Sequence, residues 1–226
     1  MAAQERVLVG FDFPLGYPAG FAAALGLRGW RDTWAELGRL VVDGADNSNN
    51  RFAVAAELNA RLGDGPGPFW GCPASAAART LLPTKPAYGA IAEYRLTEKR
   101  LQARGKQLSS VWKLYAQPTV GSQSLLGVPR VRALVTDERL AAVSRVWPFD
   151  PLDDRRPLVL HCEVWPGTIP VDATLHAVRD AAQVLSLVRW TARLDAEGRL
   201  ERLFALDLTA AERRVCEREE GWILGA

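Results

Sequence analysis

The sequence has little cysteine and no long apolar run. Its three cysteines, Cys72, Cys162 and Cys216, are far apart and odd in number, so neither a zinc site nor a disulfide framework is indicated and reduced thiols are expected. No apolar run approaches the roughly 18–20 residues that a membrane span needs. The first residues, MAAQE, lack the basic and then apolar layout of a signal peptide. We therefore expect a cytoplasmic protein with no membrane contact.

The sequence also lacks a strong charge of either sign. The net charge is +2 at pH 7, and 24% of the residues are charged, which is ordinary for a globular protein. A nucleic-acid contact would need a local basic patch, which bulk charge neither shows nor excludes. Eight tryptophans are present, and several adjoin Pro or Gly. This placement favours rings that wedge loops against a core, with a stacking surface for bases or sugars as the alternative.

The 226 residues fit one large domain or a domain with a substantial insertion. Apolar runs predict two buried strands, over 6–12 and 158–165. A mostly helical region separates them, and a surface loop is expected over 146–157. The helices expected in that region cover 21–25, 31–42, 52–62, 91–104, a stretch that begins near 121, and 137–146. The order indicates an α/β fold.

The helix predicted over 175–194 follows the second strand and has a wide apolar face. That face is formed by Val178, Ala181, Ala182, Leu185, Val188 and Ala192. Residues 199–206 are expected to form a short strand or an extended arm. Thr209 and Glu212 have the spacing of a capping box, which predicts that a final helix begins there.

Three carboxylates occupy comparable places in these elements. Asp12 ends the first strand, Glu163 ends the second, and Asp180 lies in the first turns of the following helix. Such positions converge at one edge of a parallel sheet, where open α/β sheets place their sites. Because clustered carboxylates repel one another, a hard cation such as Mg²⁺ or Mn²⁺ is expected between them. The pattern predicts a metal-dependent phosphoryl-transfer or phosphodiester-cleaving site.

Each carboxylate also has a purely structural interpretation. Asp12 could accept backbone N–H groups of the Pro- and Gly-rich turn that follows it, and Glu163 could pair with an arginine. Asp180 could be an acidic residue favoured by the helix dipole. The two histidines, His161 and His176, are expected to be structural or surface residues. The metal interpretation depends on all three carboxylates occurring together.

Five other polar residues are candidates for a substrate-binding rim. Asn50 and Arg51 could contact a ligand or cap the helix expected at 52–62, and Lys85 could meet a phosphate or be solvated. Ser122 and Gln123 follow a glycine at a possible helix N-terminus, which suits an anion. The lysine of a P-loop is missing there, so a plain turn is the alternative.

Several motifs carry a family resemblance along nearly the whole chain. They include "VGFDFPLGYPAGF", "NNRF", "GSQSLLGVPRV", "EVWPG", "RDAAQV" and "EEGWILG". In these motifs the chain resembles a bacterial family of uncharacterised proteins related to predicted nucleases of RNase H-like fold. Some members are labelled molybdopterin-guanine dinucleotide synthesis proteins. The resemblance implies a single RNase H-like domain over 1–226, with a partly parallel sheet, flanking helices and a mainly helical insertion at about 18–150.

The resemblance also implies that Asp12, Glu163 and Asp180 fall on the acidic positions of that fold. One departure concerns the start of the chain. Such proteins usually begin with a β-hairpin region whose first strand carries a leading aspartate, in a motif like "VDWSA", whereas here the strand with Asp12 comes almost first. The first three strands are therefore expected to be missing, which leaves the edge of the strand at 7–12 uncovered. A homodimer through this edge is one expectation.

These observations predict a divalent-metal-dependent hydrolase of phosphodiester bonds, with nucleic acid or a nucleotide as its partner. One alternative is a non-catalytic RNase H-like module that binds nucleic acid, a nucleotide or a protein partner. A second alternative, suggested by the family label, is an enzyme linked to molybdopterin-nucleotide metabolism.

Overall fold

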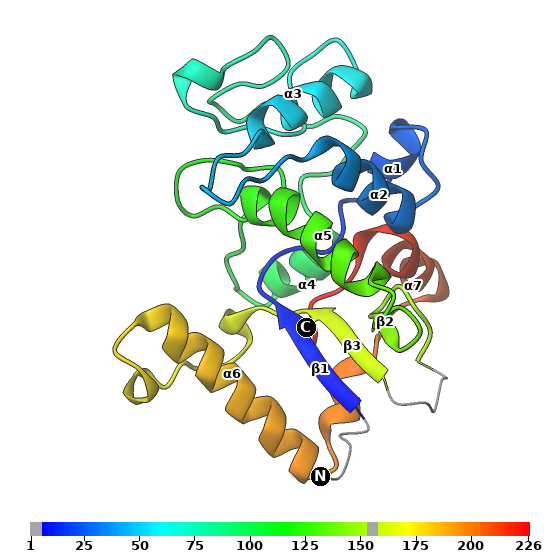
Figure 1. The fold of residues 1–226 in the computed structure, drawn as a ribbon, viewed down its shortest axis with the longest axis vertical. Coiled ribbons are helices and arrows are strands. Elements are labelled where there is room, and N and C mark those ends of the chain that lie inside the picture. Colours follow the sequence, from blue (N-terminus) through cyan, green and yellow to red (C-terminus); the bar gives the residue numbers. More distant parts are fainter. Residues whose placement is uncertain (1–5, 153–157) are drawn as a thin grey trace.

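The computed structural model describes residues 6–152 and 158–226, so part of the loop expected over 146–157 lies outside the described residues. Within them the chain has a mixed α/β fold, with seven α-helices and one three-stranded parallel sheet (Figure 1). The strands are β1 (Arg6–Phe11), β2 (Ser144–Val146) and β3 (Leu158–Glu163), in the order β1-β3-β2. The α/β class and both predicted strands are confirmed, but the expectation that β1 is buried is wrong, because its residues are exposed or half-buried.

The register of the sheet brings the two predicted strand ends together. Phe11 is the partner of Glu163, and Gly10 is the partner of Cys162. The carboxyl ends of β1 and β3 therefore lie side by side, as the sequence pattern required. The helix expected over 137–146 is wrong, because turns occupy 137–143 and β2 follows. A strand of three residues is too short to show a periodicity of two.

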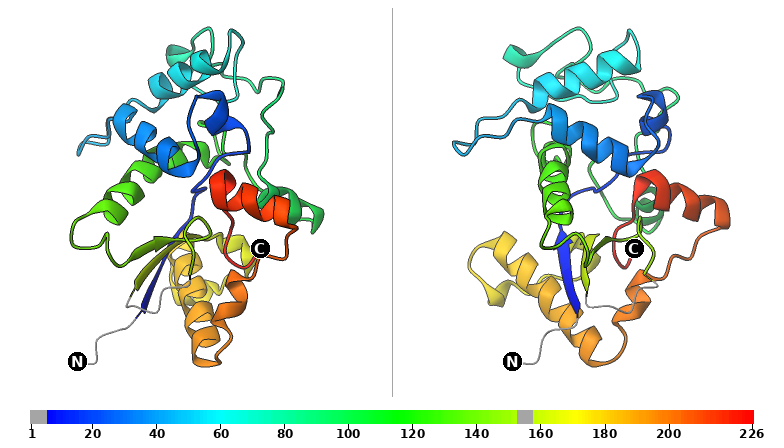
Figure 2. Two further views of the ribbon diagram at one scale, coloured as in Figure 1. Left: turned by 90° about the vertical axis from the view of Figure 1, so that its right-hand side faces the viewer. Right: turned by 45° about the vertical axis from the view of Figure 1, so that its right-hand side comes forward.

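Most helices lie on one side of the sheet. Helices α1–α5 lie beyond the carboxyl ends of β1 and β3, whereas α6 runs beside β1 (Figures 1 and 2). Helices α3 and α6 therefore lie at opposite ends of the molecule. Their bounds are α1 (Phe21–Ala24), α2 (Trp30–Leu40), α3 (Arg51–Leu62), α4 (Leu96–Ala103), α5 (Gly121–Thr136), α6 (Arg179–Ala196) and α7 (Ala210–Val215). The capping box predicted at Thr209 is present at the start of α7.

The main core is aromatic and lies between the helices beyond the sheet. The rings of Tyr17, Phe21, Phe69 and Trp112 contact one another, with the centroids of Phe69 and Trp112 4.9 Å apart. Edge-to-face contacts of this kind add to the stabilisation from burying the rings themselves. Trp34 and Trp222 are also buried. Of the tryptophans that adjoin Pro or Gly, Trp147 and Trp222 are buried in the core, as the wedge interpretation predicts, whereas Trp70 and Trp165 are half-buried.

One face of the sheet packs against the C-terminal segment. Leu160 and Cys162 of β3 belong to the same apolar cluster as Cys216, Trp222 and Leu224. The segment then pairs with the end of β3, through a parallel bridge between Ile223 and Glu163. All three cysteines are buried and unpaired, and burial raises the pKa of the Cys162 thiol to about 12. They are therefore packing residues.

Helix α6 differs from the sequence-based expectation in its orientation. Most of the predicted apolar face points to solvent, and Val178 and Val188 are 58% and 56% exposed. Ala182 is the one buried member of that face, and the helix buries it together with Ser186 and Leu194. The expected extended arm at 199–206 is a 3₁₀ helix over Leu200–Phe204.

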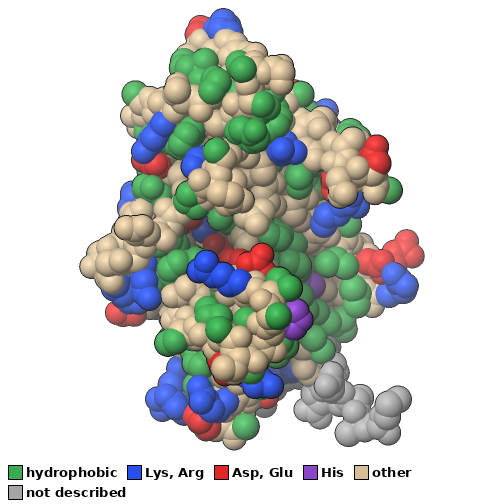
Figure 3. Space-filling view, turned by 90° about the vertical axis from the view of Figure 1, so that its left-hand side faces the viewer, with side chains coloured by type: hydrophobic (Ala, Val, Ile, Leu, Met, Phe, Trp, Pro, Cys, Tyr) green, Lys and Arg blue, Asp and Glu red, His purple; other side chains and the backbone are tan. Residues whose placement is uncertain are grey.

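Strand β1 lies beside α6 (Figure 1). Among the described residues it pairs only with β3, so its other edge is open. Figure 3 shows hydrophobic side chains on the surface that borders α6. The homodimer expected at this edge stays a prediction. In the described part of the chain, no helix combines the length and the apolar character that crossing a membrane requires.

Candidate active site

A cavity of about 670 Å³ lies at the carboxyl ends of β1 and β3. It opens between α6 and the helical part of the molecule, where acidic and basic side chains meet in the hollow seen in Figure 3. Asp12, Glu163 and Asp180 all line it. The prediction that one sheet edge gathers these three carboxylates is therefore confirmed, whereas their roles differ.

The backbone at the end of β1 directs Asp12 into the cavity. Phe11 and Phe13 pack against the main core, with their ring centroids 5.7 Å apart. Phe13 rests on Gly127 of α5, where a Cβ atom would come within 2.4 Å of the ring. Because neighbouring side chains in an extended chain point to opposite faces, Asp12 points away from this packing. Its side chain is exposed on the cavity wall.

The electrostatic surroundings of Asp12 are unfavourable for its charged form. Burial against the cavity wall, followed by the charges of Glu163 and Asp180, raises the pKa of Asp12 to about 6. Within the described residues, neither Asp12 nor Asp180 has an ion-pair or hydrogen-bond partner on its side chain. The interpretation of Asp12 as an acceptor of turn N–H groups is thus wrong for these residues. Two carboxylates without a neutralising partner share one cavity.

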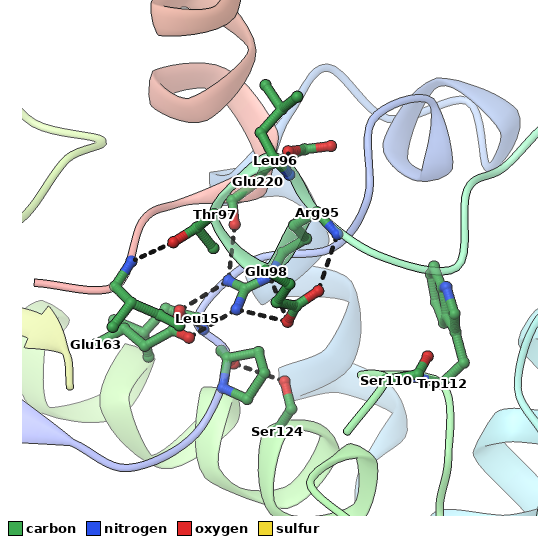
Figure 4. Close-up of polar contacts among 12 residues, drawn as sticks. Leu15, Arg95, Leu96, Thr97, Glu98, Ser110, Trp112, Ser124, Glu163 and Glu220 are labelled. Carbon is green, nitrogen blue, oxygen red and sulfur yellow. Dashed lines mark hydrogen bonds and ion pairs between the residues drawn. The ribbon is translucent and has the colours of Figure 1, made fainter. Parts of the chain in front are cut away.

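Glu163 is held in a different way, by a buried arginine (Figure 4). Nη1 of Arg95 lies 2.7 Å from Oε2 of Glu163, and Nη2 lies 2.6 Å from Oε1. The backbone N–H of Leu15 also donates to Glu163 Oε2, at 3.2 Å. Glu163 is only 3% exposed and Arg95 is fully buried. The structural alternative, that Glu163 pairs with an arginine, is confirmed.

Arg95 is the centre of a larger buried network. It donates to Oε1 of Glu98 at 2.9 Å and to the backbone carbonyl of Glu220 at 2.9 Å. Burial by itself would lower the pKa of Arg95, but the charges of Glu163 and Glu98 outweigh this and raise it. Burial raises the pKa of Glu98. The network therefore joins β3, α4 and the C-terminal segment through one permanently charged guanidinium.

The carboxylates do not form the expected three-ligand metal centre. Across residues 6–152 and 158–226, no group of three His, Cys, Asp or Glu side chains lies close enough together to hold a metal ion. Glu163 contributes to the electrostatics of Asp12, yet both of its oxygens are bonded to Arg95. A metal ion at this edge of the sheet would therefore take its protein ligands from Asp12 and Asp180.

Of the five predicted rim residues, the structure places Gln123 on the cavity wall, in the first turn of α5. The other four lie elsewhere and have internal partners. Asn50 accepts from Val42 N and donates to Leu40 O, which ties the end of α2 to the start of α3. The remaining three side chains bond to Asn49 (Arg51), Glu93 (Lys85) and the carbonyl of Leu114 (Ser122).

Other residues that line the cavity were not among the predicted site residues. Gln107, Gln117 and Gln183 line it, together with Trp165 and Arg179. The spacing of three residues between Asp180 and Gln183 places both on one face of α6, and this is the signal that could have indicated Gln183. Gln107 and Gln117 come from irregular loops, where no periodicity indicates which way a side chain points.

The cavity thus combines two unpaired carboxylates, one arginine and several amides. Oxygen ligands of this kind suit a hard cation, and an arginine and amides can bind phosphate or polar heterocycles. The assignment depends on this chemistry alone, because no family model, no curated protein and no solved structure matches the chain.

Proposed function

We propose that the protein is a divalent-metal-dependent hydrolase of phosphodiester bonds, built on an RNase H-like core. The observation that carries the proposal is the pair of carboxylates, Asp12 and Asp180, that share a cavity at the ends of parallel strands without a cationic partner among the described residues. Nucleic acid or a nucleotide would be its substrate.

The donor set fits Mg²⁺ or Mn²⁺ in a specific way. Magnesium commonly takes one or two carboxylates, keeps several waters and binds phosphate oxygens of the substrate. Desolvation, and after it the charges of Glu163 and Asp180, raise the pKa of Asp12, and a bound cation would stabilise the charged carboxylate against both. Bound there, the ion would activate a water molecule and neutralise charge on the scissile phosphate.

The remaining residues of the site have positioning roles in this proposal. The Arg95–Glu163 pair holds the N–H of Leu15, and thereby fixes the chain just after Asp12. Arg179 precedes Asp180 in the first turn of α6 and lines the same cavity. It offers a positive charge to a phosphate beside the two carboxylates.

An RNase H-like core is the finer fold assignment that goes with this function. It is supported by a carboxylate after β1, a second at the end of the neighbouring parallel strand β3, and a third in the first turn of α6. The insertion expected at about 18–150 stays a prediction: helices α1–α5 fall within it, and so does strand β2.

Binding of Mn²⁺ is the direct test, measured by electron paramagnetic resonance on the full chain. Asp12→Asn and Asp180→Asn should each weaken Mn²⁺ binding at least tenfold and abolish Mn²⁺-dependent cleavage of single-stranded, duplex or branched nucleic acid. Asp195→Asn is the matched control, since Asp195 is an exposed carboxylate of α6 outside the cavity. Unchanged Mn²⁺ binding in both site variants would contradict the proposal.

A non-catalytic nucleic-acid-binding module is the second candidate. It is favoured by the engagement of Glu163 with Arg95, which leaves two carboxylates for a metal rather than three. Measurable affinity for nucleic acid with no metal-dependent cleavage of any substrate would support this candidate over the hydrolase.

A further inference from the structure

The cavity gathers glutamine side chains to an unusual degree. The sequence contains six glutamines, and four of them, Gln107, Gln117, Gln123 and Gln183, line this one cavity. They come from the loop after α4, the loop before α5, the first turn of α5 and the second turn of α6. Convergence of one neutral polar side chain from four separate segments indicates a surface built to recognise a ligand.

These amides are available for a ligand. Within the described residues, none of the four side-chain amides makes a hydrogen bond. By contrast, the buried amide of Asn59 is fully engaged, donating to two backbone carbonyls and accepting from Phe69 N. Each free glutamine offers two donor hydrogens and a carbonyl acceptor. The four together present both donors and acceptors to whatever occupies the cavity.

The charge of the lining narrows the class of ligand. Arg179 is the one Lys or Arg that lines the cavity in the described part of the chain. Tight binding of a duplex depends on many phosphate contacts from basic residues, so a cavity with one arginine is poorly suited to a duplex. Neutral amides instead match neutral groups with mixed donors and acceptors, such as the edges of nucleobases.

An aromatic wall completes the site. The indole of Trp165 lines the cavity and lies against Gly167. A Cβ atom at position 167 would come within 2.3 Å of the ring, so the glycine is what lets the indole occupy this position. Aromatic rings are the usual stacking partners of unpaired bases, and each such contact contributes about 1–3 kcal/mol.

We propose that the cavity binds an unpaired nucleotide, with the amides of Gln107, Gln117, Gln123 and Gln183 contacting its base. Its phosphate would meet the divalent cation that Asp12 and Asp180 are proposed to hold. The substrate class is therefore single-stranded nucleic acid or a dinucleotide rather than duplex. A volume of about 670 Å³ lies within the range of small-ligand pockets. This inference rests on the proposed phosphodiester chemistry and adds the specificity for an unpaired base.

The test compares ligands that differ only in their bases. A fluorescent single-stranded tetranucleotide, its abasic counterpart and the matching duplex are titrated into the full chain by anisotropy, with Ca²⁺ present so that binding is measured without turnover. The tetranucleotide should bind at least tenfold more tightly than the other two. Gln123→Met and Gln183→Met should each weaken its binding about three- to tenfold, the effect of one lost hydrogen bond, and leave abasic binding unchanged.

Gln102→Met is the matched control, because Gln102 belongs to α4 and does not line the cavity. Equal affinity for the tetranucleotide and its abasic counterpart would overturn the inference, as would tighter binding of duplex or of an uncharged oligosaccharide. Mn²⁺ binding without nucleic acid is measured in parallel. If the wild-type protein does not bind Mn²⁺, the proposed hydrolase is contradicted. The base-binding site is tested separately, by the difference in affinity between the tetranucleotide and its abasic counterpart.

Discussion

Glu163 and Asp12 are acidic residues at the ends of neighbouring parallel strands, and their surroundings are opposite. Glu163 is buried, bonded through both oxygens to Arg95 and contacted by the N–H of Leu15. Asp12 lies on a cavity wall and is accessible to solvent, without a partner among the described residues. Partial desolvation, and after it the charges of Glu163 and Asp180, raise its pKa to about 6. The same position at a strand end thus carries a buried ion pair in one case and an unpaired carboxylate, the proposed metal ligand, in the other. The difference between the two carboxylates is the presence or absence of an arginine partner.

The largest effect is expected from removing Arg95. Arg95→Met leaves Glu163 and Glu98 buried without their counter-charge, which should lower the free energy of unfolding by about 3–5 kcal/mol. Urea denaturation measures this change. Lys99→Met, on the exposed side of α4, should have an effect within about 0.5 kcal/mol. The double variant Arg95→Met/Glu163→Met should be less destabilised than Arg95→Met alone, and the reverse order would show that the pair is not the source of the effect.

Glu163→Gln separates the structural role from a ligand role. The amide keeps the size of the side chain but loses the charge-assisted bonds to Arg95, so we expect a loss of stability of about 1.5–3 kcal/mol. Mn²⁺ binding should persist in the folded variant. If Mn²⁺ binding vanishes while near-ultraviolet circular dichroism stays native, Glu163 is a metal ligand and the contrast with Asp12 fails.

Asp12→Asn should behave in the opposite way to Glu163→Gln, keeping its stability and losing Mn²⁺ affinity. The substitution removes a charge that Glu163 and Asp180 oppose, so the metal-free protein should be at least as stable as wild type at pH 7. Mn²⁺ binding should weaken at least tenfold, because one of two protein ligands is lost. A clear loss of stability in urea, with Mn²⁺ affinity unchanged, would show that Asp12 has a structural role like that of Glu163.

A smaller effect is expected from pH, and its sign follows from the raised pKa of Asp12. Between about 4 and 6 the folded state holds this proton more tightly than the unfolded state, so the stability contributed by the protonated carboxyl is complete below about pH 4 and is lost as the pH rises through 6. Wild type should therefore lose stability relative to Asp12→Asn as the pH rises from about 4 to 6. Since protons compete with the metal, Mn²⁺ affinity should rise through pH 6 and then level off. An affinity that stays constant from pH 5 to 7 would contradict the raised pKa.

The sequence predicted those features that local patterns encode. Apolar runs located β1 and β3, the Thr209–Glu212 spacing located the start of α7, and strand ends located Asp12. The partner of Glu163 could not be predicted, because Arg95 is 68 residues away in the chain and resembles any other charge of a solvated helix. The orientation of α6 was also missed, since an apolar face indicates burial only when something in the structure covers it.

The Arg95 network also has a consequence for the order of folding. The guanidinium needs the carboxylate of Glu163 and the carbonyl of Glu220, and the end of β3 pairs with Ile223. A ribosome releases the chain from its N-terminus onward, so Arg95 emerges long before these partners exist. Until β3 is synthesised the guanidinium has only Glu98 beside it, and the carbonyl of Glu220 becomes available later than Glu163. The site at the end of β1 therefore cannot reach its final form during synthesis of the preceding residues, and its completion is a late event in the life of each molecule.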